Sequence, residues 1–377
     1  MNRRLLLVAW AAWTVLGASA GVAAGSLLRD FELPPGFRIE RYAADVPGAR
    51  SLTLGAAGVV YVGSRETGKV YALVPRAGQA PQVRIVAEGL NRPNGVAWHE
   101  GALYVAETRR ILRYPDLDRH LDAPPAAQIV RDDLPTETWH GLRYIGFGPD
   151  GKLYLSIGAP CNVCVPAAFT RGDATLEYGS ITRMNPDGSR WEVVARGVRN
   201  SVGFDWRPGS GELWFTSNGR DWLGDDAPPD TLNRLRRIGE NFGFPYCHAG
   251  TIPDPKYGGL HACTEFAPPA LALPAHVAAL GMRFYTGTMF PPQYRGRIFI
   301  AEHGSWNRST RIGYRVVSVP IDGQGRAGPE EVFASGWLSG EAVRGRPVDV
   351  LTMPDGALLV SDDLAGCVYR IVYAPGA

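Results

Sequence analysis

A turn followed by an apolar strand recurs six times along this 377-residue chain, and this repeat restricts the fold more than any other feature. Each instance starts at a glycine and carries a large apolar side chain three residues later. The six glycines are Gly58, Gly101, Gly151, Gly211, Gly296 and Gly356. Most units contain a second apolar strand soon afterwards. A period of about 45 residues built from such hairpins is typical of four-stranded propeller blades. The sequence therefore predicts an all-β protein, a six-bladed β-propeller.

The interval between the fourth and fifth instances is the longest, and residues 219–290 are therefore predicted to hold an insertion. Such insertions often rise from the ligand-binding face of a propeller. The early strand at 37–42 is expected to pair with the last blade and close the ring. The formal net charge is only +2, without a long basic run, so no nucleic-acid partner is expected.

The first residues have the pattern of a secretory signal. Arg3 and Arg4 precede an apolar run at 5–16, and small residues follow up to position 24. We predict a signal peptide at 1–24, one propeller domain at 25–377, and a periplasmic or secreted protein without stable membrane insertion. The alternative is a retained anchor, although the run is shorter than the roughly 20 residues that a membrane span needs.

The five cysteines suit an oxidising compartment. Cys161 and Cys164 are expected to form one loop disulfide, Cys247 and Cys263 a second, and Cys367 to be a buried free thiol. Haem attachment would require a histidine directly after Cys164, where a valine stands. A zinc site or a redox-active dithiol would need a second ligand pair or a following helix, and neither pattern is evident.

Two polar clusters precede repeated strands by about ten residues, a spacing that places them near the ends of inner strands. The first contains His140, which suits a general base at neutral pH or, alternatively, a packing role. The second contains Arg199 and Asn200. The guanidinium of Arg199 suits an anionic or carbonyl oxygen, and its alternative is a salt bridge between blades.

A third cluster extends from Gly219 and Arg220 to Asp230. Oxygen-rich loops with glycine and proline suit Ca²⁺, although the spacing is not that of an EF-hand, and a solvated acidic loop is the alternative. The fourth cluster could hold carboxylates between paired arginines or be surface charge. It contains His303, Arg308, Arg344 and Arg346.

Together these clusters resemble the glucose/sorbosone dehydrogenase family, soluble six-bladed propellers that use pyrroloquinoline quinone (PQQ). The resemblance covers residues 34–373, and the sorbosone dehydrogenase-like branch is the most similar. The segments that carry it lie at 140–158, 197–203, 230–235, 240–245 and 281–287.

The resemblance implies PQQ and Ca²⁺ as cofactors and a role for several of these residues. His140 would be the base that removes a substrate hydroxyl proton as hydride passes to the quinone. Arg199 would stabilise charge on the quinone oxygen, and Asn200 would help to hold the cofactor. Gly219 and Arg220 would bind calcium through their carbonyls, with Asp230 beside them.

Arg346 matches the first arginine of a pair that binds the cofactor carboxylates, and Arg344 is its less securely aligned partner. A lysine of the family falls near Gly304, where His303 and Arg308 are the nearby alternatives.

Two departures concern the site. The acid that orients the histidine in the glucose-oxidising branch aligns with Ala159, so Asn162 or a backbone carbonyl would have to replace it. A glutamate of the family is Thr231 here, which weakens the case for a second calcium.

The predicted activity is PQQ-dependent oxidation of a sugar or sugar-derived alcohol or aldehyde. The chain carries no haem-attachment motif, so electrons would pass to an external acceptor such as a cytochrome or a quinone. Two rivals use the same scaffold: a calcium-dependent lactonase and a non-catalytic binding propeller.

Overall fold

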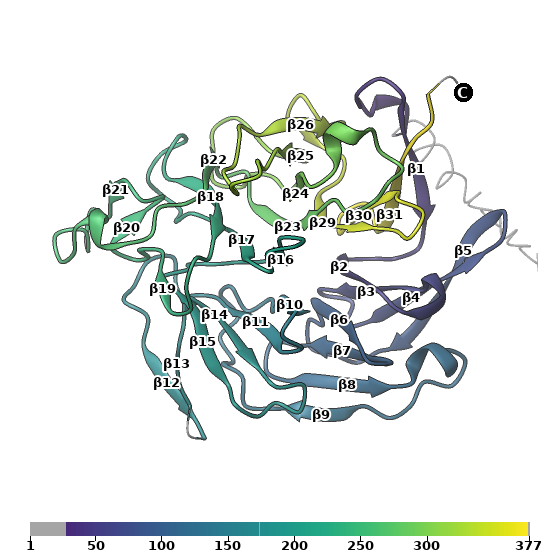
Figure 1. The fold of residues 1–377 in the computed structure, drawn as a ribbon, viewed down its shortest axis with the longest axis horizontal. Helices are drawn as coiled ribbons and strands as arrows, with labels where there is room; N and C mark the ends of the chain where they lie inside the picture. Colours follow the sequence, from purple (N-terminus) through teal and green to yellow (C-terminus); the bar gives the residue numbers. More distant parts are fainter. Residues whose placement is uncertain (1–27, 173, 376–377) are drawn as a thin grey trace, which may run out of the picture.

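The computed structural model describes residues 28–172 and 174–375, and in this part of the chain six antiparallel sheets are arranged as the blades of a ring (Figure 1). Each blade has four strands in chain order from the centre outward, except that the last takes its outer strand from the N-terminal side. The first two blades are β2 (Ala49–Leu54), β3 (Val60–Ser64), β4 (Val70–Arg76) and β5 (Gln79–Ala87), then β6 (Gly95–His99), β7 (Ala102–Ala106), β8 (Ile111–Pro115) and β9 (Gln128–Arg131). The next two are β10 (Ile145–Phe147), β11 (Leu153–Ile157), β14 (Ser180–Met184) and β15 (Glu192–Arg196), then β16 (Phe204–Trp206), β17 (Leu213–Ser217), β18 (Pro229–Arg234) and β22 (Leu271–Ala275). The last two are β23 (Ala279–Phe284), β24 (Ile298–Glu302), β25 (Arg315–Val319) and β26 (Glu331–Ala334), then β29 (Pro347–Thr352), β30 (Leu358–Asp362), β31 (Cys367–Tyr373) and β1 (Phe37–Ala43). The predicted all-β, six-bladed propeller is confirmed.

Shorter elements lie between the blade strands. They are the hairpins β12 (Ala168–Arg171) with β13 (Ala174–Glu177), β20 (Cys247–His248) with β21 (Ile252–Pro253) and β27 (Leu338–Ser339) with β28 (Ala342–Val343), the added strand β19 (Glu240–Asn241), and the 3₁₀ turns η1 (Leu28–Asp30), η2 (Ala56–Gly58), η3 (Leu117–Arg119), η4 (Cys263–Glu265) and η5 (Pro292–Tyr294).

The ring closes by pairing the two ends of the described chain. Strand β1 pairs antiparallel with β31, with Phe37 opposite Tyr373 and Ile39 opposite Ile371 (Figure 1). The expectation that the early strand joins the last blade is confirmed. The last blade therefore cannot be completed until both ends of the domain have folded.

The repeated large apolar side chains pack between neighbouring blades. All six are buried: Tyr61, Tyr104, Tyr154, Trp214, Phe299 and Leu359. Trp214 of the fourth blade, for example, packs edge to face against Phe284 of the fifth, with ring centroids 6.0 Å apart. Full burial of such a side chain contributes about 1.5–3 kcal/mol, so the repeat is the pattern of the core that holds adjacent blades together.

The first strand of each blade lies towards the centre, where neighbouring first strands approach closely. Strand β2 contacts β6 and β29, and β23 contacts β16 and β29. A Cβ on Gly203 would stand 2.2 Å from the carbonyl oxygen of Leu280, and one on Gly281 would stand 2.1 Å from a carboxylate oxygen of Asp349. These glycines allow the inner strands to pack at this spacing.

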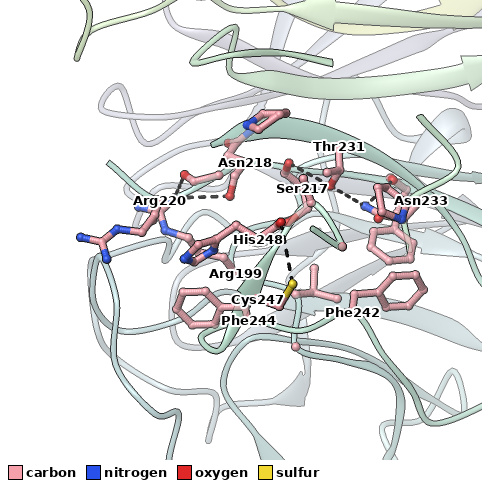
Figure 2. Close-up of a pocket in the computed structure, with 18 residues that line it drawn as sticks. Arg199, Ser217, Asn218, Arg220, Thr231, Asn233, Phe242, Phe244, Cys247 and His248 are labelled. Carbon is pink, nitrogen blue, oxygen red and sulfur yellow. Dashed lines mark hydrogen bonds between the residues drawn. The ribbon is translucent and has the colours of Figure 1, made fainter. Parts of the chain in front are cut away.

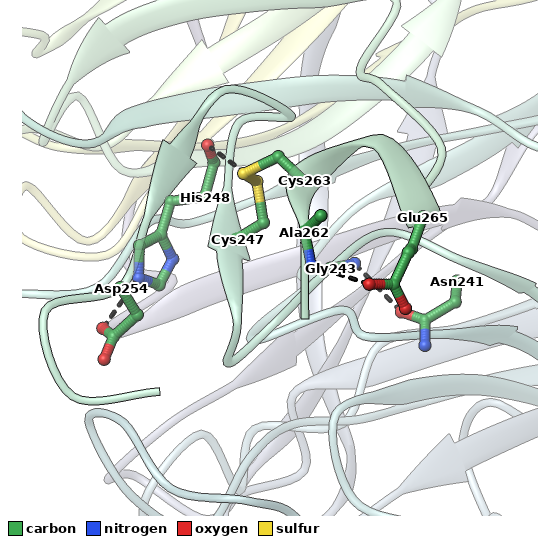
Figure 3. Close-up of a disulfide and its surroundings, with 8 residues drawn as sticks. All are labelled: Asn241, Gly243, Cys247, His248, Asp254, Ala262, Cys263 and Glu265. Carbon is green, nitrogen blue, oxygen red and sulfur yellow. Dashed lines mark hydrogen bonds and ion pairs between the residues drawn. A yellow bond between two sulfur atoms is a disulfide. The ribbon is translucent and has the colours of Figure 1, made fainter. Parts of the chain in front are cut away.

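The inserted residues cover a narrower range than the predicted insertion at 219–290. The predicted range includes the blade strands β18, β22 and β23, whereas only residues 235–270 form the added segment between β18 and β22. This segment projects from the ring at the left of Figure 1. The Cys247–Cys263 disulfide joins its two arms, and His248 bonds Asp254 within it at 3.0 Å (Figure 3).

Both predicted disulfides, Cys161–Cys164 and Cys247–Cys263, are present, and Cys367 is a buried free cysteine. The predicted signal peptide at 1–24 lies outside the described residues. Among the residues that are described, no helix is long and apolar enough to cross a membrane.

Two kinds of loop open on the same face of a propeller: those that join the fourth strand of a blade to the next blade, and those that join its second and third strands. His140 and Arg199 lie on loops of the first kind, before β10 and β16. Gly219 and His303 lie on loops of the second kind, after β17 and β24. The fold thus brings the predicted clusters to one face.

Candidate active site

A cavity of about 350 Å³ lies where these loops meet. Six of the residues that the sequence predicted for the site line it: His140, Arg199, Asn200, Gly219, Asp230 and His303. Its other lining residues come from loops and strand ends that are widely spaced in sequence, between Arg50 and Trp306. This convergence of residues distant in sequence is the arrangement expected of a ligand site on a propeller.

His140 is held as a neutral imidazole with one free nitrogen. Its Nδ1 lies 2.7 Å from the carbonyl oxygen of Ala159. A carbonyl only accepts hydrogen bonds, so Nδ1 carries the proton and Nε2 keeps its lone pair. Burial, together with the nearby charge of Arg199, lowers the pKa of His140 to about 3. The residue is therefore available as a proton acceptor throughout the neutral range.

The backbone around His140 leaves no space for alternatives. His140 has φ 47°, in the left-handed region that histidine seldom adopts. A Cβ on Gly158 would stand 2.3 Å from the Cβ of His140, closer than two non-bonded carbons can approach. Gly158 is thus required for His140 to reach its position.

Ala159 connects the two residues predicted to be catalytic. Its carbonyl accepts from His140, and its N–H donates to the carbonyl of Arg199 at 2.8 Å. Of the two replacements considered for the missing acid, the backbone carbonyl is the one used. It belongs to the very residue, Ala159, that stands in place of the acid.

Asn162, in the loop closed by the Cys161–Cys164 disulfide, holds Arg199 instead. Its carbonyl accepts from Nε of Arg199 at 2.8 Å, and its Oδ1 accepts from Nη2 at 2.9 Å. Asp221 accepts a further bond from Nη2 at 2.9 Å, and the carbonyl of Gly219 accepts from Nη1 at 2.6 Å. Arg199 is buried, and this set of acceptors fixes its guanidinium rigidly at the cavity wall.

Asn200 also faces the cavity, held by neighbouring amides. Its Nδ2 donates to Oδ1 of Asn218 at 3.2 Å, and Asn218 in turn donates to the carbonyl of Ala279 at 2.8 Å. The chain Asn200–Asn218–Ala279 links the loop before β16 to the first strand of the next blade.

A second charged network surrounds Asp363, whose side chain is almost completely buried. Asp363 accepts from Nη1 of Arg50 at 3.1 Å, from Nε2 of His303 at 3.1 Å and from Nε of Arg346 at 3.0 Å. Burial opposes ionisation, but the hydrogen bond from His303 and the charges of the two arginines hold the pKa of Asp363 well below its usual range. This carboxylate fixes three cationic or donor groups in one place.

The sequence of this chain matches the profile of the family described as TrAA12-like over residues 31–374. The chain belongs to the TrAA12-like family. The matched residues span nearly all of the described propeller, so the match is not confined to one motif.

Some proteins similar to this TrAA12-like chain are described as quinone-dependent sugar dehydrogenases. A protein of Borreliella burgdorferi, described only as uncharacterized, is 33% identical over 373 residues, 94% of each chain. A pyrroloquinoline quinone-dependent pyranose dehydrogenase of Coprinopsis cinerea is 34% identical over 122 residues, 27% of this chain and 16% of that one. The holo PQQ domain of a pyranose dehydrogenase from the same fungus superposes with a TM-score of 0.76 at 20% identity, over 91% of this chain and 97% of that domain.

Structural neighbours of the TrAA12-like chain are PQQ-dependent pyranose and aldose dehydrogenases with the same fold. The family resemblance indicated by the motifs is thereby confirmed.

The charges lining the cavity fit an anionic cofactor. Four arginines line it, Arg50, Arg65, Arg92 and Arg199, together with His303. Arg65 and Arg92 share one carboxylate, that of Glu66, at 3.0 and 3.3 Å. The arginine side of the cavity thus keeps excess positive charge, which is the requirement for holding a tricarboxylate such as PQQ.

Three of the predicted cofactor-binding residues, Arg308, Arg344 and Arg346, do not line the cavity. Arg308 bonds the carbonyl of Asp225 and, at 3.0 Å, the carboxylate of Asp226. Arg344 pairs with Asp30 at the surface. Neither side chain lines the cavity. The sequence placed both arginines in loops of the right face, but the acids that bind them, Asp226 and Asp30, are distant in sequence.

The position near which the family has a lysine is closed to any side chain here. A Cβ on Gly304 would stand 2.3 Å from the ring of Tyr314, and Gly304 has φ 107°. The Tyr314 hydroxyl donates to the carbonyl of Ser305 at 2.6 Å, which holds the ring in place. His303 and Trp306 are the residues of this loop that line the cavity.

Two of the three predicted metal ligands already have partners within the protein. Gly219 directs its carbonyl at Arg199, and Asp230 accepts from the N–H groups of Gly219 at 2.7 Å and Ala279 at 3.3 Å. Ca²⁺ takes six to eight oxygens. Among the described residues, no group of three or more His, Cys, Asp or Glu side chains could hold a metal ion.

A smaller cavity of about 40 Å³ lies behind Arg199, between the fourth blade and the added segment (Figure 2). Phe242 and Phe244 of the added segment line it together with polar residues of the blade, Thr231 and Asn233. Asn233 donates to the Thr231 hydroxyl at 2.9 Å. The threonine that replaces the family glutamate is thus satisfied by a neighbouring amide.

Sequence reasoning missed Arg50, Arg65, Arg92 and Asp363. A signal for two of them was present, because the residue directly after the second strand of a blade points to this face. Those residues are Arg65, Glu107, Gly158, Asn218, His303 and Asp363. Aligning the repeats at that position would have found Arg65 and Asp363 beside His303.

Proposed function

We propose that this chain is a PQQ-dependent dehydrogenase that oxidises a sugar or a sugar-derived alcohol or aldehyde. The observation that carries the proposal is His140, a neutral imidazole whose free Nε2 lies in a cavity lined by four arginines. A base and a cluster of anion-binding groups in one cavity suit proton removal beside an anionic cofactor.

In this proposal Arg50, Arg65 and Arg92 bind the carboxylates of PQQ, with His303 and Arg346 positioned through Asp363. When bound, PQQ supplies a two-electron acceptor. Arg199 contributes a fixed positive charge at the opposite wall, and Asn200 contributes an amide.

The proton leaves the substrate hydroxyl for Nε2 of His140. The bond from Nδ1 to the Ala159 carbonyl steadies the ring and stabilises the imidazolium that forms. A backbone carbonyl carries no net charge, so it stabilises the cation less than a carboxylate would. Burial and the charge of Arg199 lower the pKa of His140 and outweigh the opposing effect of this bond, and the low pKa favours rapid release of the proton.

Export and electron transfer belong to the same proposal. The two disulfides support a periplasmic or secreted location. Electrons would leave for an external acceptor, a cytochrome or a quinone.

The test uses the purified mature chain. PQQ binding is measured first by quenching of protein fluorescence, and dye reduction is then followed with glucose, sorbosone and a panel of other pyranoses. We expect micromolar or tighter PQQ binding and sugar-dependent dye reduction that His140→Ala abolishes while PQQ binding persists. Failure to bind PQQ at micromolar concentration would contradict the proposal, and lactone hydrolysis without PQQ would favour the lactonase.

A further inference from the structure

Three tryptophans at or near the cavity mouth expose much of their rings. Trp306 is 67% exposed, Trp222 65% and Trp139 52%. Trp139 and Trp306 line the cavity, and Trp222 follows Asp221, which also lines it. Large apolar side chains placed in solvent beside a ligand cavity indicate a binding surface rather than a folding requirement.

Two of these rings form a defined pair. Trp222 and Trp306 lie edge to face, with ring centroids 5.4 Å apart and planes at 87°. They come from the loops between the second and third strands of neighbouring blades, β17 to β18 and β24 to β25. A perpendicular pair leaves ring surface open on two sides of a corner.

The loops that carry this pair are joined to each other by polar contacts. Arg308 donates to the carbonyl of Asp225 and to the carboxylate of Asp226. The N–H of Ser309 donates to Asp225 at 3.0 Å. His276 bonds the carbonyl of Gly224 at 2.8 Å, which ties the same loop to the fourth blade. Arg308 thus has a structural task, which is to hold the Trp222 loop against the Trp306 loop.

The backbone conformation of Trp222 also supports an orientation imposed on this side chain. Trp222 has φ 69°, a left-handed conformation that is disfavoured for a bulky side chain. Burial does not compensate, because most of the ring remains in solvent. The surrounding contacts therefore impose an orientation that the residue would not adopt alone.

We propose that Trp222 and Trp306 form a stacking site for a second sugar ring, so that the preferred substrate is an oligosaccharide or the end of a longer glycan. This inference rests on the proposed sugar oxidation. Flat aromatic surfaces pack against the C–H faces of pyranose rings, and polar groups then select among hydroxyls. Trp222 is outside the cavity lining, so an occupant that touches both His140 and Trp222 extends beyond a single ring in the cavity.

The first experiment measures binding without turnover. The mature chain, free of PQQ, is titrated with glucose and with the trisaccharides cellotriose, mannotriose and xylotriose while tryptophan fluorescence is recorded. At least one trisaccharide should bind, and Trp222→Ala should weaken that binding by about tenfold. Arg308→Gln should weaken it as well, because the loops would lose their link. The exposed Ile129 on β9, 59% exposed, supplies the matched control Ile129→Ala, which should not change binding.

The second experiment compares substrates in the PQQ-loaded enzyme. The ratio of kcat/KM for the trisaccharide that binds to kcat/KM for its constituent monosaccharide should fall about tenfold in Trp222→Ala. An unchanged ratio, or an equal loss for both sugars, would overturn the inference. Slower reduction of a protein electron acceptor in Trp222→Ala, with unchanged trisaccharide binding, would assign the surface to that acceptor and would also overturn the inference.

The two experiments separate this inference from the proposed function. Trisaccharide binding that depends on Trp222, without oxidation of any sugar, would support the stacking site and contradict the dehydrogenase. Oxidation of monosaccharides, without trisaccharide binding, would support the dehydrogenase and contradict the stacking site. Thermal unfolding of each variant checks that the fold is intact, as expected for exposed side chains.

Discussion

The imidazole Nδ1 of His140 donates to the carbonyl of Ala159 at 2.7 Å, and Ala159 in turn donates its N–H to the carbonyl of Arg199. One alanine backbone therefore positions both groups that the sequence marked as catalytic. Because the contact uses main-chain atoms, changing the side chain at 159 would not remove it. The predictions below test this arrangement and the network on the other side of the cavity.

Replacing His140 by glutamine should lower kcat by about 10²–10⁴, because a general base contributes that much to proton transfer. Stopped-flow reduction of the PQQ-loaded protein by sugar measures the effect directly. PQQ affinity serves as the control and should change little. Retention of wild-type kcat would show that another group removes the proton.

The pH dependence should lack a limb at the usual histidine pKa. Since the pKa of His140 is about 3, the residue stays neutral and kcat/KM should not fall between pH 7.5 and 5.5 for this reason. The sign for stability is equally defined. Because the pKa of His140 is lower in the folded protein, the unfolded chain binds the proton more readily. The free energy of unfolding therefore falls as the pH drops from about 6.5 towards 3. NMR titration of His140 checks both statements, and a pKa near 6.5 would refute them.

Gly158→Ala should impair catalysis without unfolding the protein. The added methyl would stand 2.3 Å from the Cβ of His140, so His140 must move away from the substrate. A loss of about 10²-fold in kcat is expected for a displacement of about 1 Å. Gly323→Ala is the matched control, since nothing lies within 4 Å of its added Cβ. Equal activity in the two variants would contradict the required close approach.

Asp363→Asn should destabilise the fold by about 3–5 kcal/mol, because removal of one partner leaves the buried charge of Arg50 uncompensated. Urea unfolding measures the change. Asp122→Asn breaks an ion pair with Arg84 in which the aspartate is 89% exposed, and it should cost less than about 1 kcal/mol. Similar losses in both variants would show that the buried network contributes nothing special.

The two disulfides should differ in what they support. Cys247 and Cys263 are 16 residues apart, and replacing both by serine should destabilise the fold by about 3 kcal/mol through loop-closure entropy. Cys161 and Cys164 are only three apart, so their replacement should cost less stability. It should nevertheless lower kcat more, because this loop carries Ala159 and Asn162. Thermal unfolding and turnover, measured on both double variants, decide between these roles.

The repeat predicted the fold because its physical cause is local. Each blade is one hairpin-rich unit with a turn glycine and a large apolar side chain, such as Trp214 or Phe299, that packs between blades. The closing strand β1 was predictable for the same reason, since a ring must satisfy its edges. The insertion was harder to delimit, because the edge strand β22 and the inner strand β23 lack the repeated turn.

Part of the site was also readable from the sequence. His140, Arg199, Asn200, Gly219 and His303 line one cavity because each stands on a loop that the repeat assigns to the same face. Arg308 and Arg344 stand on loops of that face too, yet they bond Asp226 and Asp30. Their direction depends on acids distant in sequence, and no local pattern reveals such pairs.

The sequence alone determined that this chain is a six-bladed propeller and that it resembles the glucose/sorbosone dehydrogenase family, because hairpin periodicity and motif order are properties of neighbouring residues. Only the tertiary structure decided that Ala159 orients His140 through its carbonyl, that Asp363 joins Arg50, His303 and Arg346, and that Trp222 meets Trp306. Each of these contacts joins residues from separate loops or strands, and the packing of the blades into a ring decides which of them meet.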